Sequence, residues 1–156
     1  MMLSEFTETE EDFPSSGELD FWGVHEAAIT LPASADSAML REEARPYDLG
    51  ERTAVFGQKV IRLAKTVPFN PVNNPILTQL VKAATSPGAN YCEANDSISA
   101  KDFKHRISIC RKEAKETRYW LRMLATSEPK ITDEARALWR EATELNLIFP
   151  SIWRKA

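Results

Sequence analysis

Residues 99–126, SAKDFKHRISICRKEAKETRYWLRMLAT, decide the fold of this chain. Ser99, with Asp102 three residues on, is typical of a helix N-terminus, because a serine hydroxyl can accept a backbone N–H of the first turn. Beyond it, apolar residues recur at the spacing of one face of an α-helix. That face consists of Phe103, Ile107, Cys110, Ala114, Leu121 and Leu124. The stretch therefore predicts a long amphipathic helix that buries this face.

Two further helices are predicted before this stretch, each with an apolar stripe at helical spacing. The first begins at Asp48, where Glu51 three residues on gives the capping-box arrangement, and it ends at Pro68. The second begins at Asn74, an N-cap residue followed by Pro75. Proline suits the first helical position because the N–H that it lacks would have no partner there.

Proline also marks the places where the helical pattern changes. Pro87–Gly88 interrupts the second helix and predicts a kink or a break, since proline lacks the N–H that a helix interior requires. A last helix is predicted to begin at the N-cap residue Thr132 and to carry an apolar seam as far as Phe149. Four amphipathic helices with short connections, and no strand pattern, predict an all-α fold, an antiparallel up-and-down four-helix bundle.

The composition divides the chain into three segments. Residues 1–45 show no sustained period and are predicted to be an acidic, disordered arm, residues 46–149 form the bundle, and residues 150–156 form a short apolar and basic tail. The arm carries eleven acidic and two basic residues, a net charge of −9, whereas residues 46–156 carry twelve acidic and eighteen basic ones, a net charge of +6. A basic body with an acidic arm indicates an anionic partner, or an arm that competes for that partner's site.

Several classes of protein are excluded by composition. The 156 residues are expected to form one domain. Two cysteines and two histidines are too few for a disulfide framework or a multi-ligand zinc site, and Cys92 and Cys110 are expected to be small core residues. No apolar run approaches the ~20 residues of a membrane span, and the acidic N-terminus is unlike a secretory signal. We therefore expect a cytoplasmic protein that does not enter a membrane.

Five cations of residues 99–126 share one sector of the helical wheel beside the apolar face, with Lys101 and Lys112 on its flank. This basic ridge consists of Lys104, Arg111, Lys115, Arg118 and Arg122. Such a ridge can follow the phosphates of RNA or DNA without reading their sequence. The alternative is a solvated helix face, paired in part to acidic neighbours. If the ridge binds nucleic acid, the acidic arm is expected to weaken that binding by occupying it.

A second polar group is expected to be partly buried. It consists of Asn90, Glu93, Glu113 and Glu116, and we expect it to form a structural network with arginine and lysine side chains of adjacent helices or subunits. A carboxylate-bridged metal site of the bundle type uses Glu-x-x-His pairs, and the sequence contains none. The sequence thus predicts no metal, no cofactor and no catalytic residue.

Two aromatic features are expected at the surface or at a subunit contact. Trp120 lies off the apolar face of its helix and is expected to pack against a neighbouring subunit. Residues 147–153, LIFPSIW, follow the last helix and either cap the bundle or dock on a neighbouring subunit.

Three motifs, in order along residues 47–146, carry a resemblance to a known family. They are YDL at 47–49 with ER at 51–52; QLVKAATS at 79–86, GANY at 88–91 and EA at 93–94; and RKEAKET at 111–117 with YWL at 119–121. Together they resemble the four-helix-bundle proteins encoded by 23S ribosomal RNA intervening sequences, a family related to the accessory variability protein of diversity-generating retroelements. Pro87 departs from the family pattern, in which an aliphatic residue is usual.

The resemblance implies a basic, homopentameric ring of four-helix bundles with no catalytic residues. In the retroelement branch, the accessory protein binds a reverse transcriptase and nucleic acid and supports mutagenic complementary-DNA synthesis. We therefore expect a non-enzymatic, oligomeric bundle that binds nucleic acid, as an accessory subunit of a reverse transcriptase. The alternative is a protein–protein adaptor that docks through its N-terminal arm or C-terminal tail, with the basic ridge merely solvated.

Overall fold

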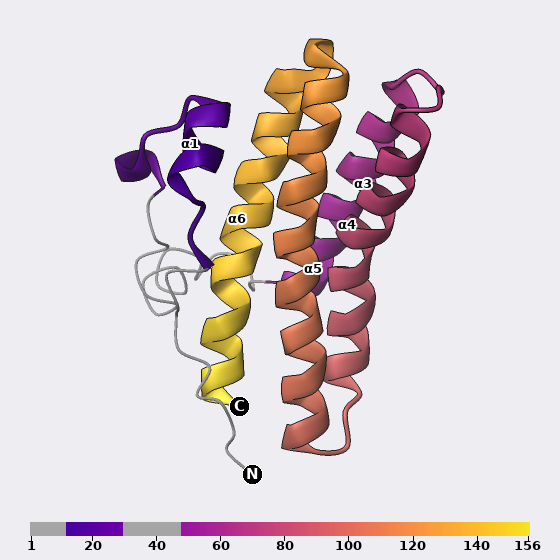
Figure 1. Cartoon of the computed structure of the whole chain (residues 1–156). Helices are drawn as coiled ribbons and strands as arrows, with labels where there is room; N and C mark the ends of the chain where they lie inside the picture. The colour runs from indigo at the N-terminus through magenta and orange to yellow at the C-terminus, as the bar shows by residue number, and fades with distance from the viewer. Residues whose placement is uncertain (1–11, 30–47) are drawn as a thin grey trace.

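A computed structural model describes residues 12–29 and 48–156. Its main body is a bundle of four long helices that run alternately up and down and are joined by short connections (Figure 1). They are α3 (Leu49–Thr66), α4 (Asn73–Asn95), α5 (Ala100–Ser127) and α6 (Thr132–Lys155). α5 packs extensively on both α4 and α6, whereas α3 packs mainly on α4. The predicted all-α helical bundle is confirmed.

The predicted apolar faces meet in one core. Side chains from all four helices are fully or almost fully buried there, among them Phe56, Val60, Leu80, Ala84, Ile107, Cys110, Ala114, Leu121, Leu124, Leu145 and Phe149. Phe103, predicted on the same face as Ile107, is only partly buried at the edge of this core. The 3.6-residue period of the sequence therefore identifies the interior of the bundle correctly.

Two of the predicted helix starts are confirmed. The Asp48 carboxylate accepts the backbone N–H of Glu51 at 2.9 Å and caps α3. The Ser99 hydroxyl accepts the N–H of Asp102 at 3.1 Å and caps α5. Each cap satisfies a donor that the first helical turn leaves without an intrahelical partner.

The predicted cap of α4 at Asn74 is wrong. The N-cap position is Val72, and the side chain of Asn70 does the capping, because its Oδ1 accepts the N–H groups of Val72 at 2.9 Å and of Asn73 at 2.8 Å. Asn74 already lies within the helix, and its own Oδ1 accepts the N–H of Asn70 at 3.1 Å. The two asparagines thus cap reciprocally, and Pro75 lies inside the first turn rather than at its first position.

The predicted cap of α6 at Thr132 is also wrong. A 3₁₀ turn, η3 (Pro129–Ile131), leads directly into α6, so Thr132 is already helical. Its hydroxyl donates to the Pro129 carbonyl at 2.7 Å instead of accepting an N–H. The predicted acidic first turn of α6, Asp133 and Glu134, is present.

α4 passes through Pro87 without the predicted break. The helix is continuous from Asn73 to Asn95, with Pro87 buried inside it. The Pro87 carbonyl accepts the thiol of Cys110 on α5 at 3.4 Å, and Gly88 lies against Thr53 of α3. Contacts with both neighbouring helices support this turn, although proline removes one of its internal hydrogen bonds.

The bundle does not end at residue 149 as predicted. α6 continues through Pro150 to Lys155, and Leu147, Phe149 and Pro150 are buried. Ile152 and Trp153 are partly buried and pack against the core. These contacts make the expected C-terminal tail the last turns of α6 rather than a separate segment.

Part of the N-terminal arm is helical, contrary to the prediction of disorder. α1 (Ser16–Trp22) is capped by the Ser15 hydroxyl and ends at Gly23, whose φ of 62° suits glycine, and a 3₁₀ turn, η2 (Glu26–Ala28), follows. α1 lies beside α6 in Figure 1, and Leu19 and Trp22 join the hydrophobic core. Residues 1–11 and 30–47 lie outside the described part of the chain. Within residues 12–29 and 48–156, no helix has an apolar stretch long enough to cross a bilayer.

Replacing Ile107 by alanine tests the position of the core. Ile107 is fully buried, so Ile107→Ala should lower the free energy of unfolding by about 2–5 kcal/mol, measured by urea denaturation. Ile98 is 99% exposed, and the same change there should alter stability by less than about 0.5 kcal/mol. Equal losses at the two positions would contradict the packing described.

Candidate nucleic-acid interface

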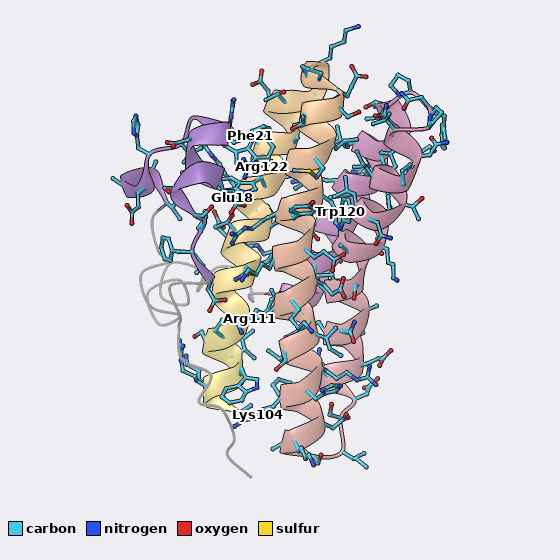
Figure 2. The ribbon with its side chains drawn as sticks, in the orientation of Figure 1. Glu18, Phe21, Lys104, Arg111, Trp120 and Arg122 are labelled. Carbon is cyan, nitrogen blue, oxygen red and sulfur yellow. The ribbon has the colours of Figure 1, made fainter. Side chains whose placement is uncertain are left out.

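The five cations of the basic ridge all lie on α5 but do not form one continuous exposed surface. Arg118 is only 3% exposed, whereas Lys115 is in solvent, and Lys104, Arg111 and Arg122 are partly buried. Figure 2 shows Arg111 and Arg122 on the side of α5 that faces the N-terminal segment. The surroundings of each cation therefore decide whether it can bind an external ligand.

Arg118 is held by two groups of the N-terminal segment. Its Nε and Nη2 donate to the two carboxylate oxygens of Glu18, at 3.1 and 2.9 Å. Its Nη1 donates to the backbone carbonyl of Asp12 at 3.0 Å. A planar guanidinium matches a carboxylate in this two-pronged way, so the charge of Arg118 is satisfied inside the protein.

Arg111 is paired with the buried carboxylate of Asp12. Its Nε donates to Asp12 Oδ1 at 2.7 Å, and its Nη2 contacts the same oxygen. The amide of Asn146 on α6 approaches that oxygen at 3.5 Å. Asp12 and Glu18 together thus occupy two of the five predicted phosphate-binding cations.

Aromatic rings cover two more of the five. The guanidinium of Arg122 lies 4.9 Å from the ring centre of Phe21, and the Lys104 ammonium lies 4.6 Å from the ring centre of Trp153. Both distances are within the range of cation–π attraction. The helical wheel gives the angular positions of these cations on α5, but it contains no information on what packs against them.

Lys115, the one exposed cation of the five, belongs to a second row of α5 residues that faces solvent. We call it the lysine face, and it consists of Lys101, Lys112, Lys115 and Tyr119. Arg111, Lys112, Lys115, Glu116 and Tyr119 line a shallow depression of about 430 Å³. Lys101 and Lys112 were predicted only on the flank of the ridge, and no role was predicted for Tyr119, which is 54% exposed. The spacing 112–115–119 is the signal that could have identified them.

The predicted polar network divides into two groups. Asn90 and Glu93 of α4 share Arg106 of α5: the Glu93 carboxylate lies 2.5 Å from Arg106 Nη1, and Asn90 Oδ1 accepts from the same nitrogen at 3.4 Å. The Asn90 amide also donates to the carbonyl and hydroxyl of Ser86, at 3.0 Å each. This group ties α4 to α5.

Glu113 and Glu116 lie apart from that network. Glu116 accepts the indole N–H of Trp120 at 3.0 Å. Burial raises the pKa of the Glu113 carboxyl, the negative charge of Glu116 raises it further, and Lys82 and Lys112 lower it. Glu113 is therefore a carboxylate whose ionisation is disfavoured in the folded protein.

The cysteines have different environments. Cys110 is buried as predicted, and burial raises the pKa of its thiol to about 12, so it stays protonated at neutral pH. Cys92 is exposed, and the prediction that it belongs to the core is wrong. Across residues 12–29 and 48–156, no three histidine, cysteine, aspartate or glutamate side chains come together as metal ligands.

Comparisons with known proteins find relatives of the bundle, and the family match does not include the N-terminal segment. A family model described as "23S rRNA-intervening sequence protein" matches residues 47–149. The crystal structure of a protein of unknown function, from the S23 ribosomal protein family of Bacteroides thetaiotaomicron VPI-5482, is similar with a TM-score of 0.60 and 29% sequence identity. The similarity covers 69% of this chain and 99% of that one. No curated protein matches the chain.

Replacing Glu113 by glutamine tests the electrostatics of α5. A carboxyl whose folded-state pKa is raised lowers stability once the pH exceeds its ordinary value of 4.5, because the folded state then disfavours the charge. Glu113→Gln should therefore raise the midpoint of thermal unfolding at pH 7 and lose this advantage at pH 4. The same change at the exposed Glu134 should bring no gain. A lower midpoint for Glu113→Gln at pH 7 would contradict the direction of the shift.

Proposed function

The chain belongs to the 23S rRNA-intervening sequence protein family, and from this premise we propose that it is a non-enzymatic, oligomeric bundle that binds nucleic-acid phosphates through the lysine face of α5. The observation that carries the proposal is the exposure of Lys101, Lys112 and Lys115 along one helix. Ammonium groups in solvent can exchange their counterions for phosphates, which is the main source of affinity in binding that does not depend on sequence.

The dimensions of the lysine face fit a nucleic-acid strand. Lys101 and Lys115 are fourteen residues apart on α5, roughly 21 Å at the rise of an α-helix. That length corresponds to about six nucleotides of one strand of a duplex. Tyr119 adds an exposed ring beside Lys115, and stacking of an unpaired base on such a ring contributes about 1–3 kcal/mol.

Assembly multiplies this weak contact. We propose a homopentamer, the assembly that the family resemblance implies, because several lysine faces on one particle bind a long strand with greater avidity than one face. The same resemblance supports a cytoplasmic role as an accessory subunit of a reverse transcriptase. Sedimentation of the full chain as five copies of 17.6 kDa would support the pentamer, and a monomer would contradict it.

The N-terminal segment limits which cations take part. Arg111 and Arg118 are paired with Asp12 and Glu18, so phosphates do not reach them while the segment is in place. These two pairs support the proposal that the acidic arm weakens nucleic-acid binding. Glu18→Ala should accordingly strengthen binding, and the same change at the exposed Asp20 should affect it less.

A charge reversal on the lysine face tests the proposed function. We expect the double variant Lys112→Glu/Lys115→Glu to lose tenfold or more in affinity for labelled single-stranded RNA and DNA, measured by fluorescence anisotropy of the full chain. The slope of log affinity against log salt should fall by about 2, one for each phosphate contact. Lys59→Glu/Lys65→Glu on α3 makes the same change in net charge at exposed positions.

Two outcomes would contradict the proposal. Equal losses in the α3 and α5 variants would show that net charge alone decides binding. If the wild-type chain does not bind even at low salt, the lysine face is a solvated helix face, and the adaptor alternative replaces nucleic-acid binding.

A further inference from the structure

A surface shared by α5 and α6 binds the N-terminal segment, residues 12–24, through charged groups and aromatic rings (Figure 2). We call it the docking face, and it consists of Arg111, Arg118, Arg122, Arg136, Trp139 and Asn146. Four of these six side chains are arginines, and none is a lysine. The docking face therefore offers planar guanidinium groups, which can bind a carboxylate through two donors, together with an aromatic ring.

The docking face selects a carboxylate at one position. The Glu18 carboxylate receives three hydrogen bonds, two from Arg118 and one from the indole N–H of Trp139 at 2.5 Å. Arg118 and Trp139 come from different helices, and both are buried while the segment is docked. A neutral side chain at this position would leave a buried guanidinium without its counter-charge.

An aromatic anchor follows one helical turn later. Trp22 is buried, and its ring centre lies 5.8 Å from that of Trp139. α1 ends at this residue, which frees the Trp22 carbonyl to accept from Arg136 Nε at 2.8 Å. Glu18 and Trp22 are four residues apart and share one face of the helix with the buried Leu19. The pattern that the docking face recognises is thus Glu-Leu-x-x-Trp in a helix.

The segment fits this surface incompletely. Three buried polar atoms of the contact have no hydrogen-bond partner within the described part of the chain: Asp12 Oδ2, the Trp22 indole nitrogen and Asn146 Oδ1. Each such group opposes binding, because it loses water without gaining a partner. α1 has only seven residues, too few to stay helical when it leaves the surface. Both features weaken the binding of the segment to the docking face.

The docking face lies inside the family match, whereas the segment that occupies it lies outside. The family match, residues 47–149, contains every residue of the docking face and none of the N-terminal segment. The solved relative is aligned over 99% of its own length with only 69% of this chain. The family-matched bundle therefore provides the surface, and residues 12–24, which lie outside that match, fill it.

We propose that the docking face is a binding site for an acidic helical peptide of a protein partner, with glutamate and tryptophan four residues apart, and that residues 12–24 are its built-in occupant. A partner peptide binds by displacing this segment and taking its place on Arg118 and Trp139. A protein fits this surface better than a nucleic acid, because the contact requires apolar groups on the same helical turn as the carboxylate. The proposal does not depend on nucleic-acid binding by the lysine face.

A peptide titration tests the proposal. The probe is a fluorescein-labelled synthetic peptide with the sequence of residues 12–29, added to the full chain and to its Trp22→Ala variant, whose built-in occupant lacks the anchor. The peptide should bind the variant at least tenfold more tightly than the wild type. Glu18→Ala in the peptide should reduce this affinity tenfold or more, whereas Asp20→Ala, the same charge change at an exposed position, should change it less than twofold.

Substitutions in the docking face complete the test. In the Trp22→Ala chain, Arg118→Met should abolish peptide binding, and Arg140→Met, at an exposed position of α6, should leave it unchanged. If Trp22→Ala fails to fold by circular dichroism, a Glu18→Gln chain serves in its place. The proposal is overturned if the folded variant does not bind the peptide, if Glu18→Ala and Asp20→Ala peptides lose affinity equally, or if single-stranded RNA displaces the peptide as effectively as unlabelled peptide does.

Discussion

The buried guanidinium of Arg118 is the group on which the arrangement of the N-terminal segment depends. A charge so far from water requires a counter-charge and several hydrogen bonds, and α5 and α6 do not supply a carboxylate beside it. Glu18 and the Asp12 carbonyl meet this requirement from a segment about 100 residues away in the sequence. Once Glu18 is in place, the geometry of α1 brings Leu19 and Trp22 into the core. This ion pair thus fixes the position of the segment together with the contacts of Asp12 and Trp22.

The arginine and lysine side chains of α5 have different surroundings. Arg111, Arg118 and Arg122 contact carboxylates and a ring of the N-terminal segment, whereas Lys101, Lys112 and Lys115 extend into solvent. Guanidinium groups suit partly buried pairing, and ammonium groups keep their hydration and suit reversible contact with phosphates. While the N-terminal segment is docked, the proposed nucleic acid therefore uses the lysines of α5, whereas the proposed acidic peptide uses the arginines of the same helix.

Features that depend on neighbouring residues could be predicted from the sequence, and features that depend on distant residues could not. The caps at Asp48 and Ser99 and the apolar faces of the four helices follow from local spacing. Asn74 and Thr132 have the composition of caps, but the turns before them already supply the first helical residues. The sequence of α1 shows no hydrophobic period, because seven residues are too few to show one. Only tertiary contacts keep this segment helical. The lysine face was predicted only in part, as Lys115 in the ridge and Lys101 and Lys112 on its flank, because the wheel cannot show which sector of α5 the N-terminal segment covers.

A double-mutant cycle between Glu18 and Arg118 tests this account most directly. Glu18→Gln alone leaves a buried guanidinium unpaired, whereas Arg118→Met alone leaves a carboxylate that can turn toward water. Urea denaturation of the full chain should give a coupling free energy of at least about 1 kcal/mol, with Glu18→Gln less stable than the double variant. If the two substitutions are additive within about 0.3 kcal/mol, the pair does not hold the segment in place, and the account of the docking face is wrong.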